Sequence, residues 1–168
     1  NQSTKEKSSM HAKNFPTPEA GWDIAALTAL FASDPDELGD VDVDVDGDVV
    51  FVTIKEKGGL VVSMTASGDQ VLASVLLVEE REVPRTDEFN KAALTLHKAI
   101  PLSTFGLTRV GEQNWYELFG ALSVKCGADD LVEEVAVLAT NAADAAEWIT
   151  EWKAKYDVFP AEDKGEAA

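Results

Sequence analysis

Hydrophobic and polar residues alternate along the first half of the chain in a way that is typical of β-strands. Residues 41–46 switch strictly between valine and aspartate, and the Asp46-Gly47 pair at their end favours a tight hairpin. Three further stretches of strand-like composition follow, separated by short turns rich in glycine, at 48–55, 60–66 and 70–78. Because the connections are short, the pattern predicts an antiparallel meander of four strands.

Three other segments repeat apolar residues at helical spacing. The first follows the Thr17-Pro18 pair, which favours a helix cap and first turn, and it ends before Pro35. In the second, Thr86 looks like the helix cap, and Pro101 stops the helix. The third and clearest runs over residues 129–156, with apolar positions in alternating steps of three and four. That stripe predicts packing against the sheet, and its seven-residue repeat would also suit a dimer seam or partner-binding groove.

These elements together predict an α+β fold. Between the second and third helices, residues 102–110 and 114–124 form a second predicted hairpin. The order is therefore α-β-β-β-β-α-β-β-α, with an antiparallel sheet of about five to six strands. We expect one domain over residues 16–158, with flexible tails at 1–15 and 159–168.

The charge of the chain narrows the choice of partners. Among 168 residues, 31 are acidic and 14 are lysine or arginine, which gives a formal net charge of −17. This charge repels phosphate backbones and anionic membrane surfaces, so we expect neither nucleic-acid binding nor membrane insertion. The negative charge would attract basic proteins. The simpler interpretation is that it only keeps the protein soluble. No apolar run approaches the length of a membrane helix, and the single cysteine, Cys126, allows no internal disulfide, which fits the cytoplasm.

The aspartate run resembles the first half of a calcium-binding loop. Carboxylates at Asp42, Asp44 and Asp46, with Asp48 close behind, could converge on a divalent cation. The twelfth loop position, which should supply a bidentate glutamate, is Thr53 instead, and the intervening valines indicate a straight strand. A divalent-cation module is therefore the alternative function, and a solvated strand face is the simpler interpretation.

The chain carries no recognisable catalytic motif. It has no zinc-ligand spacing, no phosphate loop and no nucleophile elbow. A nucleophile pair of Cys126 with His97 has no local signature, and a lone half-buried cysteine is usually inert. We therefore expect a protein that is not an enzyme and needs no cofactor.

Aromatic and acidic residues suggest where a protein partner could bind. Residues 33–48 contain eight acids and residues 129–151 contain seven, with no lysine or arginine in either stretch. Aromatic side chains usually pack in the core, but exposed aromatic side chains beside acidic residues would suit a basic amphipathic partner. A run of acidic residues can equally be a solvated face. The candidate partner-binding residues are Trp115, Tyr116, Trp148, Trp152, Glu147 and Glu151.

Two segments carry a resemblance to a known family. The stretch 99–106 reads AIPLSTFG and the stretch 116–123 reads YELFGALS, and both precede a long acidic last helix. Over residues 21–155 the chain resembles the YjfI-like family of uncharacterised bacterial proteins. The order of elements resembles the type III secretion chaperone-like fold, which YbjN-like proteins share.

The resemblance implies a regulatory role rather than a reaction. Members of the family tend to be encoded beside a relative of phage-shock protein A, a coiled-coil protein of membrane stress. Secretion chaperones hold an extended client as dimers, so the resemblance also leaves a homodimer open. We therefore expect a non-catalytic cytoplasmic protein-binding module, a chaperone-like adaptor or regulator with a link to an envelope-stress system of the phage-shock protein A type.

Overall fold

An antiparallel sheet forms the framework of the protein. The computed structural model describes residues 10–157. Its six strands are arranged in the order β1-β2-β3-β4-β6-β5, so that β1 and β5 are the two edges. Each neighbouring pair is antiparallel, and the register of β4 on β6 shifts once, between Leu76 and Val78. The strands are β1 (Val41–Asp46), β2 (Val49–Ile54), β3 (Leu60–Ser67), β4 (Gln70–Glu79), β5 (Thr104–Val110) and β6 (Gln113–Ser123).

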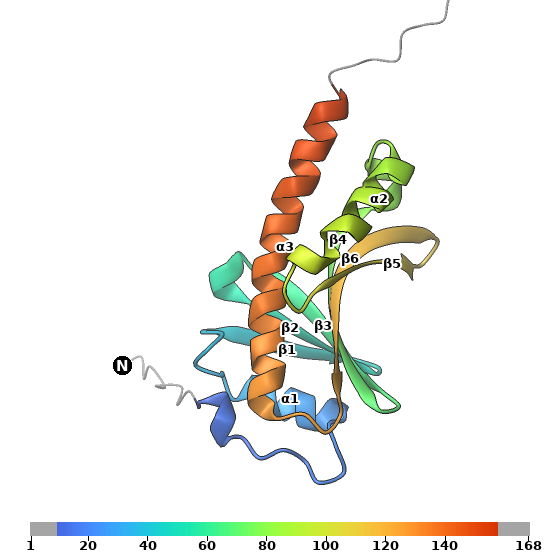
Figure 1. The fold of residues 1–168 in the computed structure, drawn as a ribbon. Helices are drawn as coiled ribbons and strands as arrows, with labels where there is room; N and C mark the ends of the chain where they lie inside the picture. The colour runs from blue at the N-terminus through green and yellow to red at the C-terminus, as the bar shows by residue number, and fades with distance from the viewer. Residues whose placement is uncertain (1–9, 158–168) are drawn as a thin grey trace, which may run out of the picture.

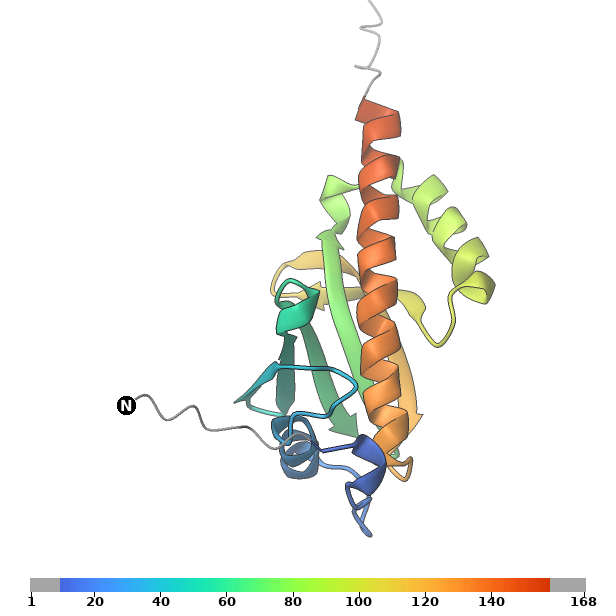
Figure 2. The same ribbon diagram turned by 90° about the vertical axis from the view of Figure 1, so that its left-hand side faces the viewer.

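The three helices lie on one side of this sheet (Figures 1 and 2). The long helix α3 crosses the sheet face, and its last turns extend beyond the strands beside α2. Short 3₁₀ turns connect the main elements, and the one that follows α2 is termed η4. The helices are α1 (Ile24–Ala32), α2 (Thr86–Leu96) and α3 (Ala128–Asp157), and the 3₁₀ turns are Ala12–Asn14, Lys55–Lys57, Glu80–Glu82 and His97–Ala99.

Alternation along each strand separates an inner face from an outer face. Every strand residue that is buried points to the inner face, toward α1 and α3, as Val52, Val62 and Ala73 do. The predicted apolar stripe of α3 packs on this face, and six of its members are buried: Leu131, Val135, Leu138, Ala142, Ala145 and Ile149. The stripe is therefore core along most of the helix, as the spacing of three and four predicts.

The predicted α+β class and the order of elements are confirmed. The start of the first helix is different from the prediction. The helix begins at Ile24, and Asp23, whose carboxylate accepts a hydrogen bond from the Ala26 amide at 2.8 Å, caps it. Thr17 and Pro18 precede the helix because Gly21 interrupts it with φ +98°, a value that side-chain-bearing residues rarely adopt.

The second helix also starts differently. Thr86, expected as its cap, is its first helical residue, and Arg85 occupies the cap position with φ +53°. The Arg85 guanidinium pairs with Glu88 at 3.0 Å instead of leaving the first turn to a hydroxyl cap. Thr86 is therefore a first-turn residue and not the cap.

Part of the predicted N-terminal tail packs against the domain. Ala12 is buried, and the ring of Phe15 stacks on Trp22 with 6.2 Å between their centroids. The remaining tail predictions, residues 1–9 and 159–168, lie outside the described residues. Over residues 10–157 no helix combines the length and apolarity that crossing a membrane requires.

Candidate functional site

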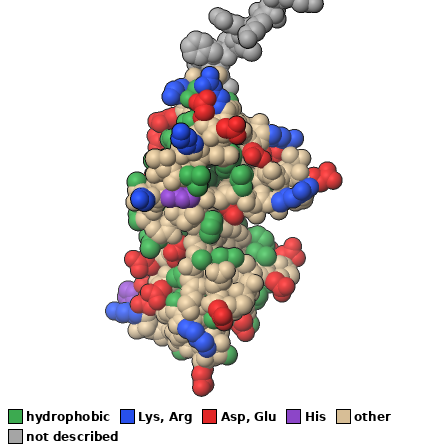
Figure 3. Space-filling view, turned by 45° about the vertical axis from the view of Figure 1, so that its right-hand side comes forward, with side chains coloured by type: hydrophobic (Ala, Val, Ile, Leu, Met, Phe, Trp, Pro, Cys, Tyr) green, Lys and Arg blue, Asp and Glu red, His purple; other side chains and the backbone are tan. Residues whose placement is uncertain are grey.

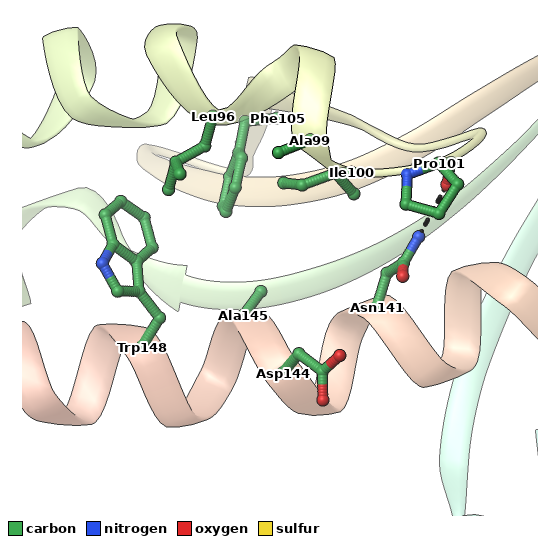
Figure 4. Close-up of a pocket in the computed structure, with 9 residues that line it drawn as sticks. All are labelled: Leu96, Ala99, Ile100, Pro101, Phe105, Asn141, Asp144, Ala145 and Trp148. Carbon is green, nitrogen blue, oxygen red and sulfur yellow. Dashed lines mark hydrogen bonds between the residues drawn. The ribbon is translucent and has the colours of Figure 1, made fainter.

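A groove of about 230 Å³ separates α3 from the segment that follows α2 (Figure 4). Side chains from the end of α2, from η4 and the loop after it, and from β5 form one wall, and α3 forms the other. Phe105 and Trp148 point toward each other across it, with ring centroids 5.7 Å apart. Seven of its nine lining residues are apolar. The lining residues are Leu96, Ala99, Ile100, Pro101, Phe105, Asn141, Asp144, Ala145 and Trp148.

Asn141 of α3 holds the opposite wall of the groove, the segment that contains Pro101 and Ser103. Its side-chain amide donates to the carbonyl oxygen of Pro101 and to the hydroxyl of Ser103, both at 2.8 Å. Ser103 is only 4% exposed, so its hydroxyl lies in the domain interior. His97 holds the same segment from the other end, because its Nε2 accepts a hydrogen bond from the Phe105 amide at 3.0 Å. The segment 97–105 is therefore a fixed wall of the groove.

An aromatic cluster supports the other end of the groove and docks α2. Phe89 of α2 stacks on Trp148 at 4.7 Å and meets the edges of Tyr116 and Trp152 at 4.8 and 5.4 Å. The indole of Trp152 donates to the carbonyl oxygen of Pro84 at 2.9 Å. Three of the candidate partner-binding aromatics thus have packing roles, while Trp148 also lines the groove.

Tyr116 is the most enclosed of these candidates. Its side chain is buried, and its hydroxyl donates to Asn90 Oδ1 at 2.7 Å. Burial, together with the charges of Glu80 and Asp87, raises the pKa of Tyr116 to about 12. A phenol with such a pKa stays neutral and serves here to bridge β6 and α2.

Three carboxylates form a stripe along α3 beside the groove. Asp144, Glu147 and Glu151 follow one another in steps of three and four, so they lie on one side of the helix. All three are exposed, and Asp144 lines the groove itself. We call these three residues the α3 acidic stripe. It continues from Asp144 in the groove lining to the predicted Glu147 and Glu151 further along the helix.

Exposed leucines surround α2 and extend the apolar surface. Leu94 and Leu102 are 67% and 58% exposed, and Leu107 on β5 lines a second groove of about 270 Å³ on the other side of α2. Leu102 has φ +60°, an unusual conformation for leucine. Figure 3 shows hydrophobic side chains gathered on the side of the molecule where α2 and β5 lie in Figure 1, with charged groups mostly toward its outline. Apolar surface of this kind is typical of protein-interaction sites.

Trp115 does not join the other candidates, because it points to the opposite face of the sheet. On that outer face a hollow of about 310 Å³ crosses the strands, lined by residues that include Leu72, Phe119 and Glu117. Burial raises the pKa of Glu117, and a hydrogen bond from Ser74 opposes that rise. The predicted set of six residues is therefore divided between two surfaces.

The aspartate run lies on the outer face of edge strand β1. Successive same-face residues of a strand are about 6.8 Å apart, too far for three carboxylates to share an ion at ligand distances of about 2.4 Å. The Lys55 ammonium pairs with Asp42 at 3.0 Å and with Asp40 at 3.2 Å. Throughout the described part of the chain, no three His, Cys, Asp or Glu side chains are grouped to hold a metal ion. The calcium alternative gains no support from this geometry.

Cys126 and His97 have separate structural surroundings. Cys126 lies just before α3, where its carbonyl oxygen accepts a hydrogen bond from the Trp22 indole at 2.9 Å. Burial raises the pKa of the Cys126 thiol, with Asp130 and Asp129 adding to the rise. His97 follows α2 and bonds to Phe105. A thiol whose ionisation is disfavoured is a weak nucleophile.

Asn141, Ser103 and the leucines around α2 are not among the site residues predicted from the sequence. Nothing in the local pattern marks Asn141, because an asparagine on the flank of a long helix is ordinary. Leu102 had a signal, since a leucine between Pro101 and Ser103 belongs to no periodic stripe. Apolar residues that belong to no periodic stripe are therefore the sequence feature that points to this exposed surface.

Comparisons with known proteins find relatives over most of the chain. The profile of a family described as "Uncharacterized protein conserved in bacteria (DUF2170)" matches residues 21–153. "Uncharacterized protein YjfI" of Escherichia coli K12 is 29% identical over 130 residues, which cover 77% of this chain and 96% of the relative. The protein of the same name from Escherichia coli O157:H7 has the same identity and coverage.

Proposed function

This chain belongs to the DUF2170 family of conserved bacterial proteins, and from that premise we propose that it is a non-catalytic protein-binding module. It acts as a cytoplasmic adaptor or regulator that holds another protein in the groove between α3 and the segment 97–105. The observation that carries the proposal is the makeup of this groove. Its lining combines seven apolar side chains with one amide and one carboxylate, which suits recognition of an apolar side chain.

The surroundings of the groove favour a basic partner segment. An apolar anchor would lie between Phe105 and Trp148, and lysines or arginines beside it would meet the α3 acidic stripe. The net charge of −17 attracts such a segment over long range and increases its association rate at low salt. The groove also needs little rearrangement on binding, because Asn141 and His97 already hold its wall.

The first partner to test is a relative of phage-shock protein A, which the family resemblance implies. A coiled-coil protein offers amphipathic helices whose apolar stripes are flanked by charged residues. Binding would connect the module to an envelope-stress response by occupying part of that coiled coil. A chaperone-like role and a regulatory role share this contact, since both require the groove to hold a segment of another protein.

Charge-neutralising variants with a matched control test the proposal. In D144N/E147Q/E151Q the α3 acidic stripe loses three charges, and in the control E19Q/D69N/E112Q three exposed acids elsewhere lose theirs. Isothermal calorimetry would measure binding of each protein to the phage-shock protein A relative encoded in the same genome. Exposed ion pairs contribute up to about 1 kcal/mol each, so we expect about a tenfold loss of affinity for the stripe variant and little change for the control.

The same pair of variants also tests whether the groove binds a protein at all, whichever protein the partner is. Proteins crosslinked to the chain in native extract would be compared between the stripe variant and the control. A stoichiometric partner lost only with the stripe variant supports the groove, whatever that partner is. Equal capture by the two variants, or no stoichiometric partner at all, contradicts the proposal.

A further inference from the structure

The outer face of the sheet is uncovered, although it is not a purely polar surface. All three helices lie on the other side, so no described element packs over it (Figures 1 and 2). Cross-strand pairs place Phe51 beside Ser63, Thr65 beside Leu72 and Ser74 beside Phe119, which gives a band of apolar and hydroxyl side chains from β2 to β6. Val61 and Leu76 on this face are 44% and 42% exposed. This band forms the hollow of about 310 Å³ described above.

The charges that the strands themselves place on the outer face are all negative, and Lys55, which follows β2, pairs with Asp42 at one end of the β1 row. Asp42, Asp44 and Asp46 face outward along the β1 edge, beside Thr53, Phe51 and Val49 of β2. Glu117 lies in the hollow, opposite Leu76 on β4. Of the outward-facing strand residues that the structure describes, none is a lysine or arginine. The face is therefore an apolar band with an acidic border and one central carboxylate.

We propose that this outer face docks an amphipathic helix of a partner protein, with its apolar stripe on the band and its lysines or arginines toward Glu117 and the β1 aspartates. Charge complementarity selects the basic partner. The dimensions favour a helix, because β2 to β6 spans about 14 Å and a helix with its side chains is about 10 Å across. Such a helix would complete a third layer, as α3 covers the inner face.

A second copy of the chain fits this face poorly. A two-fold contact would place the same acidic surface on both partners, so that carboxylates of one copy face carboxylates of the other with no outward-facing lysine or arginine of the described strands between them. Like charges in a desolvated contact oppose association, and no outward-facing basic residue of the described strands would offset them. The face is separate from the groove of the proposed function, so the two sites can be tested independently.

Glu117 is placed to receive a cation within the hollow. Its carboxylate is half-buried among Thr108, Phe119 and Ser74, and Ser74 hydrogen-bonds it. Ser63 and Ser74 share a hydrogen bond with 3.0 Å between their hydroxyl oxygens, which extends the polar floor toward β3. An incoming ammonium or guanidinium group would pair with a carboxylate that burial disfavours in its charged form, and that pairing relieves the penalty.

Nuclear magnetic resonance with a defined peptide tests the inference. The probe is a helical peptide of about 18 residues with leucines at helical spacing and lysines on both flanks, and its counterpart carries glutamate in place of lysine. With the ¹⁵N-labelled protein, we expect the lysine peptide to shift amide signals of β2, β3, β4 and β6. The glutamate peptide should leave them unchanged. Shifts confined to the groove between α3 and segment 97–105 would overturn this inference while supporting the proposed function.

Variants assign the binding to the outer face. E117Q preserves the shape of the side chain, and we expect it to weaken binding of the lysine peptide about tenfold. D42N/D44N/D46N should weaken it about fivefold, whereas E19Q/D69N/E112Q, which neutralises three exposed acids elsewhere, should leave it within about twofold. Equal weakening by the two triple variants would overturn the proposal, because it would show attraction by net charge alone. A dimer in light scattering that E117K abolishes would also overturn it, in favour of a second copy on this face.

Discussion

Asn141 of α3 donates a hydrogen bond to the hydroxyl of Ser103 at 2.8 Å, and the two residues are 38 positions apart in the chain. The same amide reaches the carbonyl oxygen of Pro101, also at 2.8 Å. One side chain thus fixes the segment that carries the exposed leucine at position 102 and forms the groove wall. The position of the candidate site depends on this contact between α3 and a loop.

Removing this amide should loosen the groove wall. In Asn141→Ala, the Ser103 hydroxyl and the Pro101 carbonyl lose their donor, and a buried polar group without a partner costs about 1–3 kcal/mol. Urea unfolding would measure the loss, and hydrogen exchange would show faster exchange at residues 102–105. Thr150→Ala is the control, because the exposed Thr150 hydroxyl donates to the Ala146 carbonyl within its own helix, and we expect a change below about 0.5 kcal/mol. Equal protection of the segment in both variants would contradict this role of Asn141.

Phe89 should contribute strongly to the attachment of α2. Its ring lies among Tyr116, Trp148 and Trp152 and is fully buried. Phe89→Ala should therefore cost about 3–5 kcal/mol and change the tryptophan fluorescence of the folded protein. Leu94→Ala on the exposed side of the same helix should change stability by less than about 0.5 kcal/mol. A small effect of Phe89→Ala would mean that α2 is held by other contacts.

Glu134 should make stability depend on pH. Its side chain is 5% exposed, and Oε1 has no hydrogen-bond partner among residues 10–157. Burial, with a smaller effect from Glu133, raises the pKa of Glu134 above its ordinary value of 4.5. The folded state therefore binds the proton more tightly than the unfolded state, and this group contributes more stability when protonated.

The sign of this effect can be measured with the neutral isostere. Glu134→Gln should be more stable than the parent protein at pH 7, by about 1 kcal/mol. As pH falls from 7 toward 4.5, the parent protonates Glu134 in the folded state and the difference should shrink toward zero. Denaturant unfolding of both proteins across this range isolates Glu134, because all other carboxyls are common to both. A difference that stays constant or grows on acidification would contradict the prediction.

Gly120 should tolerate no side chain while Glu134 is present. A Cβ added at Gly120 on the inner face of β6 would collide with the Glu134 carboxylate. We expect Gly120→Ala to cost about 1–3 kcal/mol, since added volume in a packed interior forces neighbours to move. In the Glu134→Ala background, the same change should cost much less. A double-mutant cycle would measure this coupling, and additive effects would show that the two residues do not contact each other.

The sequence alone determined much of the fold. Valine–aspartate alternation over residues 41–46 fixes which side chains share a face of the strand, because strand periodicity is two, and the stripe over 131–149 predicts a helix buried along one side. The sequence also determined the net charge of −17. Periodicity is a local property and net charge is a sum over residues, so both can be predicted from the sequence without knowing which elements contact each other.

Only the tertiary structure decided where the candidate sites lie. Trp115 and Tyr116 are neighbours in the chain, yet they point to opposite faces of β6, and Tyr116 is buried in the core. The groove requires Asn141 to meet Pro101 across 40 positions, and the outer face becomes a surface only because every helix packs on the other side. Such relationships arise from the pairing order of strands and the placement of helices. They depend on contacts between distant segments, which periodicity and composition do not specify.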